Sequence, residues 1–333
     1  MNAMTETLPQ RRAVAAPHAT HKFKLLLKRE YWEHRGGFFW APAIAAGITL
    51  LFTLMAAVGG SIFKHRHTNE IEMAGADPGE IARVLGGVGD LALLGGVGIT
   101  LIVLGFVVFF YSLGALYDDR RDRSVLFWKS LPVSDASTVG AKVAWALALA
   151  PLIAVGIGLL LGGASWVIAA LTTSINGLPG ASGIFTYSHP VQLVGHIIAM
   201  IPLYALWALP AVGWLMLCSA AARSKPFLWA VMVPVLGCAL VSFANAVMNL
   251  GVDVGKLWYV VAYRGLASVF PATWVPLVES RIDRIHGPEE FANVVNAAQN
   301  WSVAGTADLW IGVVVGVLMI LAAIRLRRWR DEG

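Results

Sequence analysis

Charged residues are scarce in this chain of 333 residues: Asp, Glu, Lys and Arg make up 14% of it, against 57% hydrophobic residues. Soluble globular chains carry about 25% charged residues. The composition therefore excludes an ordinary soluble domain and indicates an integral membrane protein. Cysteine is scarce too, and both Cys218 and Cys238 lie in apolar stretches. This argues against a disulfide framework or a cysteine-based zinc site, and we expect two small core residues.

Motifs for catalysis are also missing from the sequence. The closest approach to a phosphate-binding P-loop, Gly251 to Leu257, is one residue short and lacks the Ser or Thr that binds magnesium. There is no H-E-x-x-H, no G-x-S-x-G and no pair of aspartates inside an apolar stretch. We therefore expect no catalytic residue, no metal and no cofactor on this chain, which predicts that it is not an enzyme.

Long apolar runs are what the sequence has in abundance. A helix needs about 20 apolar residues to cross a hydrocarbon core of about 30 Å, and backbone groups in lipid must bond within the helix. The sequence predicts an all-α integral membrane protein with six transmembrane helices. The expected spans cover residues 38–60, 91–116, 143–170, 193–219, 227–250 and 306–326.

Lys and Arg are distributed unequally between the connecting segments. With the amino terminus inside, the inner segments hold 18 of these residues and the outer segments hold 7. Positive charge stays on the cytoplasmic side, so both termini are predicted to be cytoplasmic. Residues 1–19 are expected to be a disordered tail and residues 327–333 a second cytoplasmic tail. The short apolar and aromatic run at 257–278 contains Arg264, Pro271 and Pro276. We expect it to lie on or dip into the outer face, within an outer segment 251–305 that ends in a short amphipathic helix after Pro288.

A basic amphipathic pattern precedes the first span. Phe23, Leu27 and Tyr31 recur at intervals of four residues, and Lys28 and Arg29 add positive charge for anionic headgroups. The pattern predicts an interfacial helix over 20–37 that turns into the first span through two glycines. The alternative is a basic flank that only enforces the topology.

The segment 117–138, between the second and third spans, mixes both charge signs around an apolar centre, Val125 to Trp128. Pro132 ends the helical pattern, and Ser134 or Asp135 is a candidate cap for the next helix. An apolar patch with a charged rim is typical of a surface that binds a protein partner. The alternative is a solvated loop whose aromatic residues lie on the headgroups.

The run Asp119…Arg123-Ser124…Leu126…Ser130-Leu131-Pro132-Val133-Ser134…Val139…Lys142 resembles a pattern found between the second and third spans of ABC-2 type transporter permeases. These are membrane subunits of ATP-binding cassette exporters. The resemblance implies an amino-terminal elbow helix, six spans and an exporter pathway in a bacterial-type inner membrane. It also implies a segment that couples this chain to an ATPase, with the residues Asp119, Arg123, Leu126, Phe127, Trp128, Leu131 and Pro132.

The same resemblance implies the partners of the chain. These are an ABC ATPase subunit, which would hold the ATP and Mg²⁺, a second permease chain that is identical or related, and membrane lipids, but no nucleic acid. Two other functions stay open from the sequence. One is an ATP-independent membrane scaffold or assembly factor, and the other is a membrane-embedded enzyme that acts on lipid-linked substrates at 257–278.

Polar residues within or beside the apolar runs are candidates for function by default, but we expect structural roles for them because most lie near span ends. They are Asp90, His196, Asn245, Asn249, Asp253 and Asp308. Two pairs of glycines four residues apart, Gly158 with Gly162 and Gly312 with Gly316, predict faces where helices approach closely. We expect this packing within one bundle, and the alternative is a subunit interface.

Overall fold

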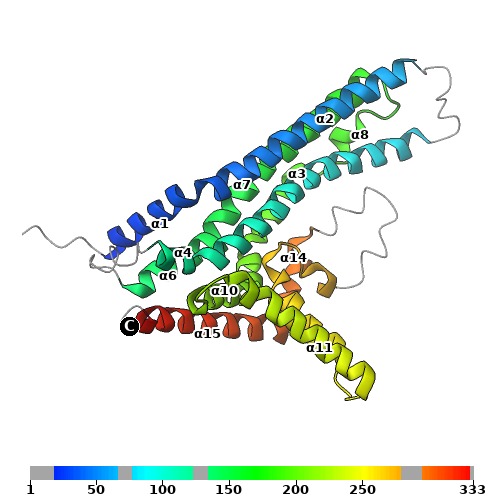
Figure 1. Ribbon diagram of the computed structural model, residues 1–333. Coiled ribbons are helices and arrows are strands. Elements are labelled where there is room, and N and C mark those ends of the chain that lie inside the picture. The colour runs from blue at the N-terminus through cyan, green and yellow to red at the C-terminus, as the bar shows by residue number, and fades with distance from the viewer. Residues whose placement is uncertain (1–18, 67–76, 123–133, 279–294, 331–333) are drawn as a thin grey trace, which may run out of the picture.

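The structure, a computed structural model, describes residues 19–66, 77–122, 134–278 and 295–330 (Figure 1). Within these ranges the regular elements are all helical. Six helical stretches are long and apolar enough to cross a membrane, which confirms the predicted all-α membrane class and the predicted number. They run over Lys22–Arg66, Gly79–Arg121, Asp135–Ile175, Pro190–Ala221, Leu228–Met248 and Ala307–Trp329.

The first span differs from the expected turn at the two glycines. Helix α1 (Ala19–Arg35) continues through a π-helical segment, η1 (Gly36–Trp40), into α2 (Ala41–Arg66). His34 departs from helical geometry and marks a kink, but α1 and α2 follow each other in nearly the same direction (Figure 1). The two glycines lie in the π-helical segment, where the helix absorbs one extra residue instead of ending.

Helices α3 (Pro78–Gly114) and α7 (Ala150–Ile175) form the main contact of the first half. Asp77 caps α3 by accepting a hydrogen bond from the Gly79 amide. The helices touch at glycines, because a Cβ on Gly162 would lie 2.4 Å from the Leu93 carbonyl oxygen. A Cβ on Gly96 would lie 2.5 Å from the Gly162 nitrogen. The predicted packing role of Gly158 and Gly162 within the bundle is confirmed.

The second half centres on α10 (Ile201–Ala221), which follows α9 (Pro190–Ala199) and packs along α15 (Ala307–Arg330). A Cβ on Gly213 of α10 would lie 2.6 Å from the Gly316 carbonyl oxygen of α15, so the second glycine pair also serves packing. Helix α11 (Val233–Met248), preceded by η3 (Leu228–Met232), contributes few buried residues. It extends away from the other spans (Figure 1).

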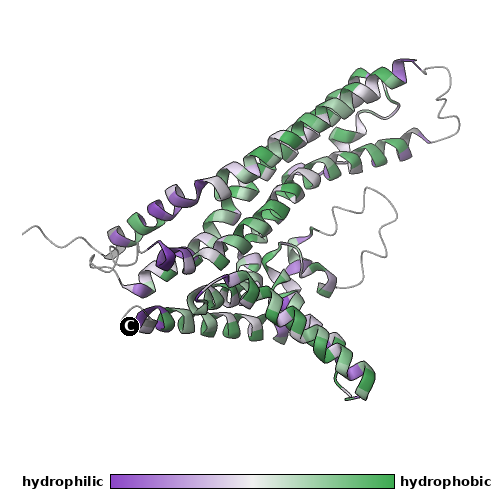
Figure 2. Cartoon of the chain, viewed as in Figure 1, coloured by the Kyte–Doolittle hydropathy of each residue, from purple (hydrophilic) through white to green (hydrophobic). Residues whose placement is uncertain are grey.

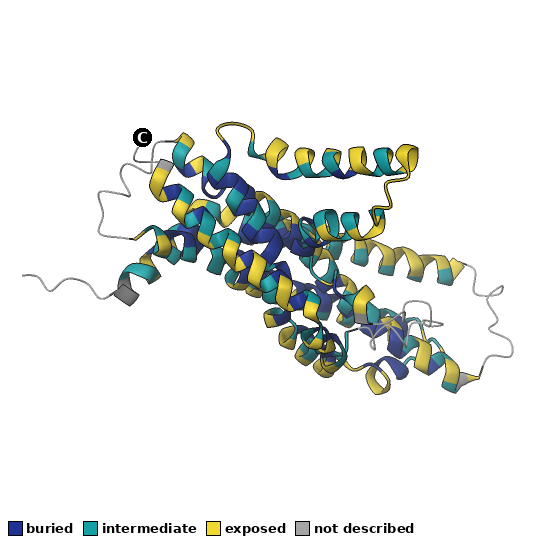
Figure 3. Ribbon diagram, turned by 90° about the horizontal axis from the view of Figure 1, so that it is seen from below, coloured by how far each residue is buried: buried dark blue, intermediate teal, exposed yellow. Residues whose placement is uncertain are grey.

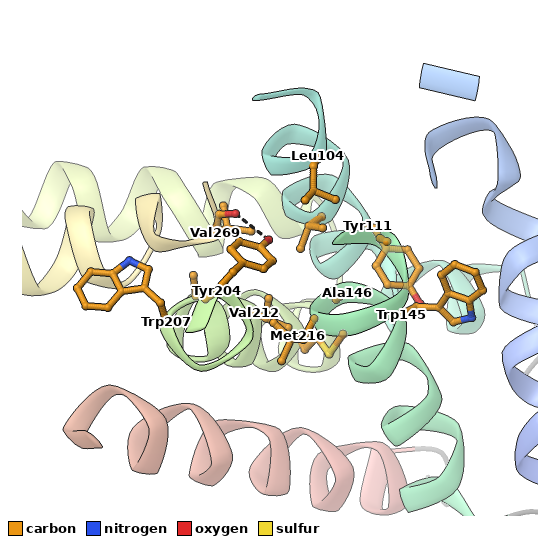
Figure 4. Packing of buried hydrophobic residues seen from close by; sticks show 14 of the residues in the cluster. Leu104, Tyr111, Trp145, Ala146, Tyr204, Trp207, Val212, Met216 and Val269 are labelled. Atoms are coloured by element: carbon orange, nitrogen blue, oxygen red, sulfur yellow. Dashed lines mark hydrogen bonds between the residues drawn. The ribbon is translucent and has the colours of Figure 1, made fainter. Parts of the chain in front are cut away.

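The part of the outer segment that the structure describes contains only short helices, and none of these is long enough to span. They are α12 (Val254–Trp258), η4 (Tyr259–Arg264), η5 (Ala267–Val269), η6 (Val275–Val278), α14 (Ala297–Asn300) and η9 (Trp301–Gly305). The Tyr204 hydroxyl donates to the Val269 carbonyl at 2.9 Å and holds this segment against α10 (Figure 4). Most of the amphipathic helix expected after Pro288 lies outside the described residues.

Buried residues gather in the middle of the molecule, where the helices cross, and exposed ones lie towards its periphery (Figure 3). Hydrophilic residues gather at the end where α1 begins, where α4 (Tyr117–Arg121) and α6 (Asp135–Ala144) lie, and where α15 ends (Figure 2). We call this the charged end. Helix α15 continues to Arg330, so the predicted tail at 327–333 begins too early, and Arg327 is a buried helical residue.

A buried ion-pair network at the charged end

Four charged side chains are buried together where α1, α4, α6 and α15 meet. Glu30, Asp119, Lys142 and Arg327 are 1%, 8%, 0% and 5% exposed, and we call them the buried ion-pair network. Each comes from a different helix, so the network exists only when all four helices are assembled. Charged residues are almost never fully buried unless they are paired.

Lys142 joins the two acids of the network. Its Nζ lies 3.0 Å from Oε1 of Glu30 and 3.5 Å from Oδ1 of Asp119. The Tyr111 hydroxyl of α3 donates to Oε2 of Glu30 at 2.9 Å. The Lys142 ammonium is therefore compensated by two carboxylates, and the Glu30 carboxylate also accepts a neutral hydrogen bond.

Asp119 receives basic groups from three elements. Besides Lys142, the Arg327 Nη1 lies 3.2 Å from Oδ2 of Asp119 and the Arg29 Nη2 lies 3.8 Å from Oδ1. Arg327 also reaches Asp135 at the start of α6, with Nε 3.4 Å from Oδ1. Asp119 thus holds the last helix of the chain to the segment that follows the second span.

A buried ion-pair network of this kind contributes more to the precise placement of the helices than to the net stability of the fold. Removing charges from water costs several kcal/mol for each ion, and the ion pairs offset this cost only when their geometry is good. Loss of one partner leaves an uncompensated buried charge, which costs about 3 to 5 kcal/mol. The two acids and two bases of the network therefore fix four helices relative to one another.

The start of α4 is tied to the end of α10 by a second set of contacts. The Ser219 hydroxyl accepts hydrogen bonds from the backbone amides of Leu116 and Tyr117, at 3.0 and 2.9 Å. The Arg120 guanidinium donates to the carbonyls of Ser219 and Ala222, at 2.6 and 3.1 Å. A helix leaves its last carbonyls without backbone partners, and Arg120 satisfies two of the carbonyls at this helix end.

Among the described residues, one group of side chains has the geometry to hold a cation. The ligand atoms of Glu30, Glu33 and His34 lie within 4.8 Å of one another. Glu30 is already paired with Lys142, however, and the ammonium would repel a cation bound to the same carboxylate. The Glu30 carboxylate is therefore better suited to its ion pair with Lys142 than to binding a metal ion.

Of the residues predicted to couple to an ATPase, Asp119 lies in the network. Arg123, Leu126, Phe127, Trp128, Leu131 and Pro132 lie outside the described residues. In the predicted interfacial helix, Phe23, Leu27 and Tyr31 are half-buried, and the Tyr31 ring stacks on Trp145 at 5.7 Å. Lys28 is exposed, but Arg29 is directed to Glu33, at 2.7 Å, and to Asp119 instead of solvent.

Sequence reasoning missed Glu30, Tyr111 and Arg327. A signal for Glu30 existed, because it falls three and four residues after Leu27 and Leu26 and so shares their helix face. Arg327 gave no such signal, since it lies among other basic residues at the end of an apolar helix, where anchoring to headgroups is the usual role.

Four of the six polar residues beside the apolar runs have structural partners. Asp90 accepts from the His189 amide at 2.8 Å, and Asp253 caps α12 by accepting from the Lys256 amide at 2.9 Å. The Asn245 side chain accepts from the Val252 amide at 3.0 Å, and His196 accepts from the Ala297 amide at 3.3 Å. Asp90 lies within α3 and binds the residue that precedes α9, whereas the other three contacts lie at or near helix ends. All four are consistent with the expected structural roles.

No family model, curated protein or solved structure matches this chain. The class of protein follows from the structure itself. Trp310 and Trp329 of α15 are both exposed and are 19 residues apart. This spacing corresponds to about 28 Å along the helix. This distance fits two aromatic belts at the faces of a bilayer. The chain is a helical, multi-pass membrane protein.

Proposed function

We propose that this chain is the permease subunit of an ABC-2 type exporter, which forms the membrane pathway together with a second permease chain. A separate ATPase would bind at the charged end and supply the energy. The proposal is supported by six candidate spans, by the resemblance of residues 119–142 to the permease pattern, and by the position of both described chain ends at the charged end (Figure 1).

The pairing of Asp119 with Lys142 supports the proposal most directly. Asp119 and Lys142 stand at the two ends of the permease-like pattern, 23 residues apart, and their side chains are paired at 3.5 Å inside the buried ion-pair network. A force applied to the segment between them enters the bundle at this point. Because Glu30 and Arg327 belong to the same network, the force also reaches α1 and α15.

The helices next to the network contain irregular segments that suit movement. The π-helical segment η2 (Trp145–Leu149) lies directly between α6 and α7, and η1 lies between α1 and α2. π-helical segments are rare and occur often at functional sites. In the proposed mechanism α6 moves with the ATPase, and η2 is where this motion changes the packing of α7 against α3.

The test is affinity purification of the chain in mild detergent, followed by mass spectrometry and an ATP hydrolysis assay. We expect an ATPase with a P-loop to copurify, and its hydrolysis rate to depend on this chain. Replacing Phe127 and Trp128 together by Glu should abolish copurification, because charge destroys an apolar docking surface, while membrane insertion stays intact.

A matched control exists at the opposite end of the molecule. Phe185 and Tyr187 are exposed aromatic residues at the short helix α8 (Gly183–Thr186), and replacing both by Glu should leave copurification unchanged. Normal ATPase copurification by the Phe127→Glu, Trp128→Glu variant would contradict the docking role. If no ATPase copurifies with the wild-type chain, an ATP-independent scaffold becomes the better account.

A further inference from the structure

A second feature, remote from the charged end, is a cavity of about 530 Å³ between α10, α11, η4 and α15. Its walls are almost entirely apolar, and pockets of 300 to 1,000 Å³ are typical of small-molecule and cofactor sites. The apolar lining includes Trp214, Gly237, Cys238, Val241, Val315 and Met319. Two charged residues also line the cavity, Arg264 and Asp308.

The two charged residues form one polar wall. The Arg264 Nε lies 3.4 Å from Oδ2 of Asp308, and the Tyr259 hydroxyl donates to the same oxygen at 2.6 Å. The guanidinium also lies over the Trp207 ring, 3.6 Å from its centroid. Burial lowers the pKa of Arg264, and the neighbouring Asp308 counters this shift. The wall thus presents one charge of each sign.

Glycine makes this wall possible. A Cβ on Gly312, one turn after Asp308, would lie 2.2 Å from Nη2 of Arg264. Any larger residue at this position would push the guanidinium out of place. Gly237 of α11 is different, because a Cβ built there meets no atom within 4 Å.

The depth of the cavity fits one leaflet of a bilayer. Asp308 is the second residue of α15, at the end of the bundle opposite to the charged end, and Met319 lies 11 residues further along the helix. At 1.5 Å for each residue this is about 16 Å, roughly half of a hydrocarbon core of 30 Å. The polar wall therefore lies near one membrane face and the apolar walls reach towards the midplane.

The surroundings of the cavity determine what can enter it. Helices α11 and α15 both expose many large apolar side chains, for example Leu240, Phe243 and Leu318. In a membrane such faces are covered by lipid, so two of the helices that line the cavity are in contact with the bilayer. A lipid has an acyl chain that can fill the apolar part of the cavity and a polar head that can contact the polar wall.

We propose that this cavity binds an acyl chain of a zwitterionic phospholipid from the leaflet opposite to the charged end, with the headgroup at Arg264 and Asp308. The phosphate faces the guanidinium, and the ammonium faces the Asp308 carboxylate, which is the more exposed of the two groups at 37%. This site does not depend on the proposed coupling to an ATPase, because it uses no residue of the charged end.

The test uses the full-length chain in lipid nanodiscs that contain phosphatidylethanolamine with a photoreactive diazirine in its acyl chain. After illumination, mass spectrometry maps the labelled residues. We expect stronger labelling of the cavity residues Cys238, Val241 and Val315 than of the lipid-facing Phe243 and Leu318. Equal labelling of the two sets would overturn the proposal.

Filling the cavity provides the matched comparison. Gly237→Phe places a ring into open space and should reduce labelling of the cavity residues several-fold, while labelling of Phe243 persists. Gly156→Phe is the control, because Gly156 of α7 also has no atom within 4 Å of a Cβ and does not line the cavity. Gly237→Leu, a smaller change, should give an intermediate loss, and this keeps the test decisive if the Phe variant fails to fold. Cavity labelling that survives both Gly237 variants would refute the site.

An excess of unlabelled lipid tests the headgroup. Unlabelled phosphatidylethanolamine should compete with the photoreactive lipid more effectively than phosphatidylglycerol, which lacks the ammonium. Equal competition by the two lipids would overturn the assignment of the headgroup to the Arg264 and Asp308 wall.

Discussion

Lys142 offers the sharpest test of the buried ion-pair network. The side chain is fully buried and its Nζ lies 3.0 Å from Glu30 and 3.5 Å from Asp119. Lys142→Met keeps the length and the apolar stem of the side chain but removes the charge between two carboxylates. Breaking a buried ion pair in this way costs about 3 to 5 kcal/mol. Since one kcal/mol corresponds to about 2 °C in a protein of this size, we expect a loss of about 6 to 10 °C.

The assay is thermal unfolding of the purified chain in detergent, followed by circular dichroism, with Lys24→Met as the control. Lys24 is an exposed residue of α1, so its replacement should leave the unfolding temperature unchanged. The double variant Lys142→Met, Glu30→Gln should recover most of the lost stability, because the Gln carbonyl still accepts the Tyr111 hydrogen bond and carries no charge. The reasoning is refuted if Lys142→Met is as stable as the wild type, or if the second substitution lowers the stability further.

Three further predictions concern other contacts. Gly162→Ala should destabilise the chain by about 1 to 3 kcal/mol through overpacking against Leu93. Gly163→Ala should not, because a Cβ at Gly163 meets no atom within 4 Å. Equal unfolding temperatures of the two variants would contradict the close contact of α3 and α7. Arg120→Met should lower the unfolding temperature by removing two hydrogen bonds to the end of α10. The same change at the exposed neighbour Arg121 should leave the unfolding temperature unchanged. A larger loss in the Arg121 variant than in the Arg120 variant would argue against this cap. Tyr204→Phe removes the buried hydrogen bond to Val269 and should cost about 1 to 3 kcal/mol, measured by the same unfolding assay; a cost near zero would show that this bond does not hold the outer segment.

The helical class and the number of spans were predictable because they depend on composition and length alone. Twenty apolar residues in a row have few alternatives to a spanning helix. The boundaries of the helices were harder to predict. Helix α3 begins at Pro78, well before the expected residue 91, because Asp77 and Pro78 provide an effective start that hydropathy does not detect.

The candidate site was predictable only in part. Asp119 and Lys142 appeared in the sequence pattern, but their pairing with Glu30 and Arg327 depends on which helices meet at the charged end. Such contacts join residues up to 208 positions apart, and no local periodicity reports them. For the same reason the turn expected at the two glycines was replaced by a π-helical segment, because packing of Phe38 against Trp145 keeps the helix continuous there.

The account depends above all on the charged end facing the cytosol, where ATP is available. Both native cysteines are buried, so we expect them to react little with a maleimide. Single cysteines can therefore be introduced and labelled in intact cells with a maleimide that does not cross membranes. Asp118→Cys, at an exposed site in α4, should react only after the cells are permeabilised, and Phe185→Cys should react from outside. Labelling of Asp118→Cys in intact cells, with Phe185→Cys protected, would contradict the orientation and with it the proposed coupling.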